Sequence, residues 1–130
     1  LDTVMPGLSL YDFGDMARST MRPCAEDCPD SDAIVARLDM FEAIAGGYLE
    51  TAGKMLTKEE IGHMAFSARL ITFETGIRFL ADYLQGDTYF KTHRDGQNLD
   101  RARVQFRMVE SMEEQTDAME KVVRTAQISA

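Results

Sequence analysis

The sequence predicts a mainly α-helical protein. Apolar residues recur every three or four positions through three long stretches, which is the spacing of helices with a buried face. Capping residues precede these stretches, and glycines follow two of them. Because long helices joined by short loops pack as a bundle, we expect the 130 residues to form a single helical domain.

The composition narrows the possible function classes. Hydrophobic residues make up 45% of the chain and charged residues 28%, which favours a globular protein over a disordered one. Acidic residues outnumber basic ones by 22 to 14, and the formal charge of -8 argues against a nucleic-acid partner. No apolar run approaches the ~20 residues that span a bilayer, and no secretory signal opens the chain. We therefore expect a cytoplasmic protein without a membrane partner.

The first residues predict a short strand followed by a helix. Leu1–Met5 alternates like a strand, yet nothing nearby offers a hairpin partner. We therefore expect that upstream residues are missing and that the chain is the carboxyl part of a larger protein. Pro6-Gly7 marks a turn. Ser9 is then a good N-cap with Asp12 as its capping-box partner, which predicts a helix from about Leu10 to Ser19.

A loop and a second helix are predicted next. Two prolines and several acids predict a loop over residues 20–30, and its two cysteines are too few ligands for a zinc site. Ser31 is the expected N-cap of the second helix, and Gly53 its end. Within it, we interpret Gly46-Gly47 as a point of close helix packing. The apolar stripe comprises Ile34, Leu38, Phe41, Ala45 and Tyr48.

The third and fourth helices are predicted to be long. A capping box at Thr57 and a C-cap at Gly86 enclose about 27 residues with two apolar stripes, which predicts a central helix buried on most sides. After a connector and a polar turn, Asn98 is the expected N-cap of a last helix that extends to about Val123. The acidic residues on the other face of that helix predict a solvated surface.

A line of charged residues on the central helix is the first candidate site. Glu74, Arg78 and Asp82 follow one another at four-residue steps on a helix that is otherwise apolar. In a structural interpretation, the two acids neutralise a partly buried Arg78. In a functional one, the Arg78 guanidinium enters a cleft and binds a carboxylate, a phosphate or a sugar hydroxyl.

Two further groups of residues could carry chemistry. Asp2, Asp12 and Asp15 lie close together near the start, where carboxylates could approach a divalent cation with phosphate. Alternatively, Asp12 and Asp15 are ordinary acids of a first helical turn. Tyr89 follows the Gly86 cap in an aromatic connector, where a tyrosine usually packs with its hydroxyl at the surface.

The sequence resembles the aminoglycoside-phosphotransferase-like kinases, and within them the bacterial N-acetylhexosamine 1-kinase branch. The resemblance covers nearly the whole chain and rests on three segments. They are the opening run Leu1-Asp2-Thr3-Val4-Met5-Pro6-Gly7 with its continuation to Asp15, the run from Gly76 to Lys91, and Asn98-Leu99-Asp100-Arg101. Some relatives are labelled mucin desulfatases, but no residue here supports sulfate-ester chemistry.

The resemblance implies the helical C-terminal subdomain of a protein-kinase-like fold, with a short N-terminal strand remnant. The N-lobe, the catalytic loop and the magnesium-binding aspartate would lie upstream, and Asp2 would match the second acid of the strand. It also implies that Arg78 and Tyr89 contact the hexosamine. ATP and Mg would serve the intact parent protein, and we expect neither to bind this chain.

The sequence thus predicts the sugar-binding part of an ATP-dependent kinase that phosphorylates N-acetylhexosamine at the anomeric hydroxyl. By itself, this chain is expected to be inactive, and its truncated face could support self-association. Two alternatives stay open: a kinase for an aminoglycoside or choline-like alcohol, and a free-standing four-helix interaction module.

Overall fold

The computed structural model describes residues 9–129, and the strand predicted at Leu1–Met5 lies outside them. The described part is mainly helical, as predicted, and contains no strand. Two short 3-10 turns, η1 (Ser31–Ala33) and η2 (Gly53–Met55), lie between the helices. The α-helices are α1 (Ser9–Thr20), α2 (Leu38–Ala52), α3 (Lys58–Gly62), α4 (Met64–Leu84), α5 (Gln97–Glu114) and α6 (Thr116–Ser129).

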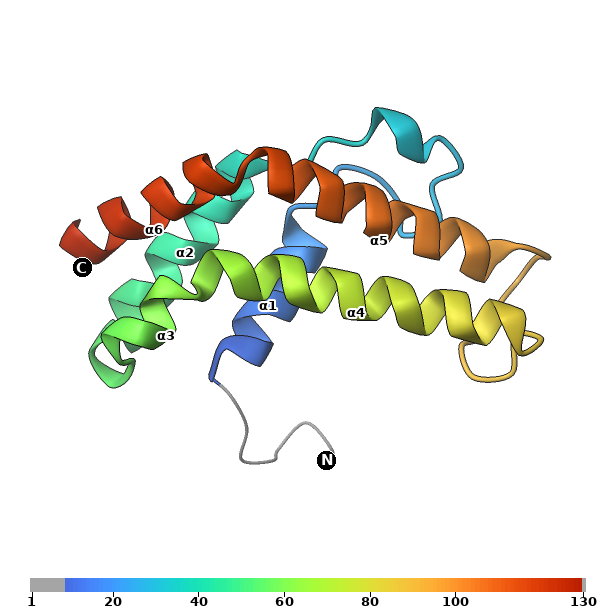
Figure 1. The fold of residues 1–130 in the computed structure, drawn as a ribbon, viewed down its shortest axis with the longest axis horizontal. Helices are drawn as coiled ribbons and strands as arrows, with labels where there is room; N and C mark the ends of the chain where they lie inside the picture. The colour runs from blue at the N-terminus through green and yellow to red at the C-terminus, as the bar shows by residue number, and fades with distance from the viewer. Residues whose placement is uncertain (1–8, 130) are drawn as a thin grey trace.

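The helices form two layers, one of α4, α5 and α6 and the other of α1 and α2 (Figure 1). Helices α4 and α5 lie side by side and run in opposite directions, and α6 continues beyond the end of α5 (Figure 1). Helix α1 packs against α4, and α2 packs against α6. The short helix α3 precedes α4, at the end of the molecule where α2 and α6 also lie (Figure 1).

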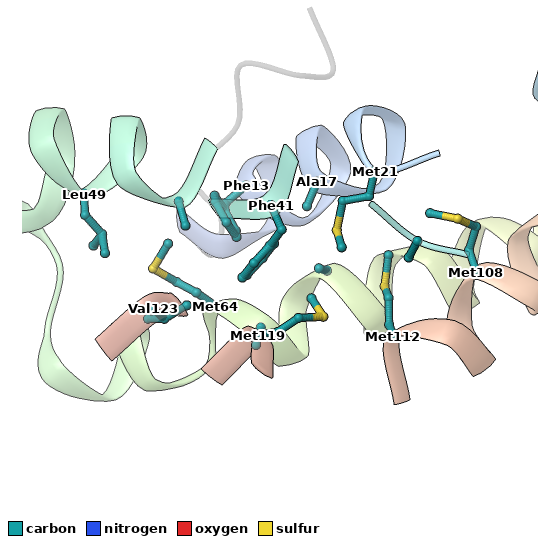
Figure 2. Close-up of a cluster of buried hydrophobic side chains, with 14 of the residues drawn as sticks. Phe13, Ala17, Met21, Phe41, Leu49, Met64, Met108, Met112, Met119 and Val123 are labelled. Carbon is teal, nitrogen blue, oxygen red and sulfur yellow. The ribbon is translucent and has the colours of Figure 1, made fainter. Parts of the chain in front are cut away.

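Aromatic and methionine side chains from five helices form the core (Figure 2). The Phe13 ring of α1 meets the Phe41 ring of α2 edge-on, with 5.9 Å between the ring centroids. Met64 and Met119 extend the same cluster from α4 and α6, and both are buried. Because a fully buried Phe or Met side chain stabilises a fold by about 1.5–3 kcal/mol, these residues hold the two layers together.

The second helix begins later than predicted. Ser31 starts the η1 turn, and α2 begins only at Leu38. Side chains of α5 and the residue after it bind the backbone between these points: the Ser111 hydroxyl accepts from the Ala36 N–H at 2.8 Å, and the Gln115 amide donates to the Ala36 carbonyl at 2.9 Å. Residues 34–37 therefore stay outside the helix because partners elsewhere in the chain bind their backbone groups, including the Met21 carbonyl, which accepts from the Arg37 N–H at 2.9 Å.

The two long helices predicted at the end of the chain are each interrupted once. The capping box at Thr57 is confirmed, but α3 ends at Gly62 and α4 starts after His63. Gln115 likewise separates α5 from α6. Asn98 is not an N-cap, since Gly96 holds that position with a φ of 75°.

Glycines do allow close packing, but not at the predicted positions. A Cβ built on Gly46 or Gly47 would meet no atom within 4 Å, so the interpretation of this pair as a packing point is wrong. Among the described glycines, Gly14 and Gly76 are the tight positions. A Cβ at Gly14 would lie 2.6 Å from the Ser67 carbonyl oxygen, so α1 can approach α4 only where a side chain is absent.

The outer face of α4 is apolar and exposed. The prediction that this helix is buried on most sides is wrong, because only its second stripe meets the core while the first faces outward. Among the described residues, the exposed members are Phe66, Leu70, Phe73, Ile77 and Leu84, which we call the α4 stripe. No helix in the described part of the chain is long and apolar enough to cross a membrane.

Candidate functional site

A cavity of about 370 Å³ lies where α1, α4 and the start of α5 meet two loops. Helix α1 contributes Tyr11, Asp15 and Arg18, and the loop after α1 contributes Glu26. The other side comes from α4, from the connector and from α5. That side is lined by Ile71, Thr75, Arg78, Phe79, Phe90, Lys91 and Arg101.

The structure brings Arg78 and Tyr89 together. The guanidinium carbon of Arg78 lies 5.8 Å from the centroid of the Tyr89 ring and 5.6 Å from that of Phe90. Both distances are within the range of a cation–π contact. Arg78 and Phe90 line the cavity, whereas Tyr89 packs edge-on against Phe90 and is 73% exposed. The two residues therefore share one face of the molecule, with Tyr89 outside the cavity lining.

Neither acid of the predicted charged line neutralises Arg78. The guanidinium is exposed rather than partly buried, and no carboxylate of the described residues lies within 4 Å of it. Glu74 is also exposed and lies over a different hollow. The structural interpretation of this line is therefore wrong, and Arg78 keeps its donors for another partner.

Asp82 instead fixes the connector that carries Tyr89. Its buried carboxylate accepts hydrogen bonds from the N–H groups of Tyr89 at 2.8 Å and Phe90 at 3.0 Å. The Asn98 side-chain amide donates to the same carboxylate at 2.7 Å. Burial acts to raise the pKa of Asp82, but these donors outweigh burial and hold the pKa below its ordinary value of 3.8.

The same connector begins at a well-formed helix end. The N–H of Gly86 donates to the Tyr83 carbonyl, and the N–H of Asp87 donates to the Asp82 carbonyl. This pair of bonds is a Schellman motif, and Gly86 adopts the left-handed conformation that the motif favours, with a φ of 95°. The predicted cap at Gly86 is confirmed, and it turns the chain back toward α4.

Sequence reasoning missed a cluster of arginines around Glu26. The oxygens of the Glu26 carboxylate lie 3.8 Å from a guanidinium nitrogen of Arg18, 3.7 Å from one of Arg22 and 3.5 Å from one of Arg101. Arg18 is also held by Asp15, which accepts from the guanidinium at 2.9 Å and 3.0 Å. The only sequence signals were the short spacings of Asp15 to Arg18 and of Arg22 to Glu26, and nothing local linked them to α5.

The described residues do not form the predicted cation site. Asp2 lies outside the described residues, Asp12 is exposed in the first turn of α1, and Asp15 pairs with Arg18. Within residues 9–129, no three His, Cys, Asp or Glu side chains gather in a way that could hold a metal ion.

No model of a known protein family matches the chain. Side chains from three segments that are far apart in the sequence, those on which the expected resemblance rests, line one cavity. Tyr11 and Asp15 come from the first segment, Arg78 and Lys91 from the second, and Arg101 from the third, and all five line the same cavity. Segments that are far apart in the sequence thus contribute to one site.

Proposed function

We propose that this chain is the sugar-binding helical part of an ATP-dependent phosphotransferase of the N-acetylhexosamine 1-kinase type, with the C-terminal architecture of a protein-kinase-like fold. The observation that carries the proposal is the convergence of the three resembling segments on one cavity. A packing role alone would not require all three segments to supply charged or hydrogen-bonding side chains to the same space.

Arg78 and Tyr89 supply the sugar contacts in this proposal. A guanidinium and a phenol both donate hydrogen bonds to neutral oxygens, as hydroxyl and acetamido groups of a hexosamine require. Asp82 positions Tyr89, because its carboxylate binds the backbone of Tyr89 and Phe90. In phosphoryl transfer the protein mainly positions groups and stabilises charge, and this chain would contribute the first of these tasks.

The charge of the cavity disfavours the other class of acceptor. Its lining carries four basic side chains, Arg18, Arg78, Lys91 and Arg101, against the two acids Asp15 and Glu26. A cationic aminoglycoside or choline-like alcohol would be repelled by this excess, whereas a neutral hexosamine would not.

Binding measured on the full chain tests the proposal. Isothermal titration with N-acetylhexosamine should detect an interaction that Arg78→Ala and Tyr89→Phe each weaken by roughly 2- to 10-fold, the effect of losing one hydrogen bond. Arg103→Ala and Tyr83→Phe are matched controls, because neither residue lines the cavity or takes part in the contact between Arg78 and Tyr89. Equal affinity in all four variants would remove Arg78 and Tyr89 from the site.

Kinetics on a longer parent protein test the assignment to a kinase. Arg78→Ala and Tyr89→Phe should raise the KM for the sugar and leave the KM for ATP nearly unchanged. The 130-residue chain itself should show no kinase activity, since its sequence contains no His-x-Asp-x-x-x-x-Asn catalytic loop. Sugar-dependent ATP turnover by this chain, abolished by Arg78→Ala, would contradict the proposal. Because the proposed reaction uses ATP, we propose that it takes place in the cytoplasm.

The α4 stripe favours a second candidate, an interaction module. Its members Phe66, Leu70, Phe73 and Ile77 follow steps of four, three and four residues, which is the spacing of a helix–helix seam. Sedimentation velocity on the 130-residue chain distinguishes the candidates. A stable dimer that Phe73→Ser dissociates favours the module, and a monomer that binds hexosamine favours the kinase part.

A further inference from the structure

The cavity between α1, α4 and α5 has a charge opposite to that of the whole chain. The formal net charge is -8, yet the cavity lining has two more basic than acidic side chains. Basic groups gathered in a concave, partly enclosed space concentrate positive potential there. This contrast points to an anionic ligand rather than to a general property of the surface.

Two buried arginine nitrogens in this cluster have no hydrogen-bond partner. They are Nη1 of Arg18 and Nε of Arg101, whose side chains are only 13% and 14% exposed. The nearest carboxylate oxygens, both from Glu26, lie 3.8 Å and 3.5 Å away, beyond the usual range of about 2.7–3.2 Å. An unsatisfied buried donor destabilises the fold, so the positive charges of Arg18 and Arg101, which both line the cavity, are only partly balanced by the described residues.

Glu26 cannot neutralise the cluster by itself. Its single negative charge is shared among Arg18, Arg22 and Arg101, none of which it reaches at hydrogen-bond distance. Across the cavity, Arg78 has no carboxylate of the described residues within 4 Å. A further anion in the cavity would offset this excess of positive charge.

The remaining arginine donors hold the cluster in place. Nη1 of Arg101 donates to the Asn98 side chain at 2.9 Å and to the Lys91 carbonyl at 3.1 Å. Its guanidinium also lies 5.7 Å from the Phe79 ring centroid. Arg18 is fixed in turn by its two bonds to Asp15. The donors are therefore positioned before a ligand arrives, which lowers the entropic cost of binding it.

We infer that the cavity binds a phosphate group, with Arg18, Arg78 and Arg101 as its main donors. A phosphate carries oxygens that accept from several guanidinium forks at once, and charge-assisted bonds of this kind are the strongest available to arginine. The cavity of about 370 Å³ exceeds the size of phosphate alone, so it suits a phosphate monoester whose organic part occupies the remaining space. The inference needs only the cavity and does not depend on the proposed sugar kinase.

Isothermal titration of the full chain with inorganic phosphate tests the inference, with sodium chloride at equal ionic strength as reference. Wild-type protein should bind phosphate, and Arg78→Gln should weaken binding about tenfold, the effect of one charge-assisted hydrogen bond. Arg103→Gln changes the net charge equally, but the exposed Arg103 side chain lies outside the cavity. The affinity of this variant for phosphate should therefore stay within about twofold of wild type. Absence of phosphate binding, or equal losses in both variants, would overturn the inference.

Glu26→Gln gives a second test with the opposite sign. Removing the carboxylate that competes for the arginines should tighten phosphate binding several-fold, whereas a purely structural cluster would show weaker binding or none. Circular dichroism establishes that each variant is folded. A hexosamine 1-phosphate should bind more tightly than inorganic phosphate if the ligand is an ester, and equally if the ligand is the free ion. Binding of neutral hexosamine without phosphate binding would refute this inference and leave the proposed function standing.

Discussion

Replacing Gly14 by alanine tests whether the close approach of α1 to α4 determines the fold and the cavity. The new Cβ would lie 2.6 Å from the Ser67 carbonyl oxygen and 2.7 Å from a side-chain carbon of Ile71. Alanine is favoured over glycine in a helix by about 1 kcal/mol, but overpacking typically costs about 1–3 kcal/mol. The obstacle is a backbone atom, which cannot rotate away, so the cost should lie at the upper end of this range and the expected net loss is about 2 kcal/mol.

Gly47→Ala is the matched control, because the same substitution in α2 meets no atom within 4 Å. It should stabilise the protein by about 1 kcal/mol. Urea unfolding followed by circular dichroism measures both free energies of unfolding. Since α1 carries Arg18 and Asp15, Gly14→Ala should also weaken phosphate binding. A Gly14→Ala protein as stable as wild type would show that the contact between α1 and α4 is not tight.

Three further outcomes follow from single residues. Thr57→Ala should lower the free energy of unfolding by about 1 kcal/mol in urea titrations, because the Glu60 N–H loses its acceptor, the Thr57 hydroxyl, while the bond from the Thr57 N–H to the Glu60 carboxylate remains; Thr57→Ser, which keeps a hydroxyl, should be nearly as stable as wild type. The lowered pKa of Asp82 means that its contribution to stability is complete above its ordinary pKa of 3.8 and is lost as pH falls through the lowered pKa. The urea midpoints of wild type and Asp82→Asn should therefore differ at pH 7 and converge in acid. Burial, helped by the neighbouring Cys28 thiol, raises the pKa of Cys24 to about 11, so iodoacetamide should modify Cys24 slowly at pH 8 in the folded protein and rapidly in urea.

Local signals predicted the helices well where local interactions decide them. The Thr57 capping box and the Gly86 cap both depend on residues within one turn, and both are present. The start of α2 could not be predicted in this way. The Ser31 signal is overridden because Ser111, 75 residues from Ala36, binds the backbone that a helix would have used.

In the candidate site too, a contact between residues close in the sequence could be predicted, and contacts between distant segments could not. The contact between Arg78 and Tyr89 was predictable, because one helix end and one turn connect the two residues. The Glu26 cluster was not, since it joins a loop to α5 through side chains that no sequence pattern relates. Hydrophobic periodicity likewise identified the apolar stripe on α4, but it could not show whether another element covers that stripe.

The bonds of Asp82 have a consequence for the order of folding. Asp82 joins α4 to Asn98 across 16 residues, whereas the contact that holds Ala36 against α5 spans 75. Because closing a short loop costs less entropy, we expect the hairpin of α4 and α5 to form first, with Arg78 and Tyr89 already in contact. The cavity would then be completed last, when α1 and the Glu26 loop dock. Pulse-labelling hydrogen exchange should show α4 and α5 amides protected before those of α1, and simultaneous protection would refute this order.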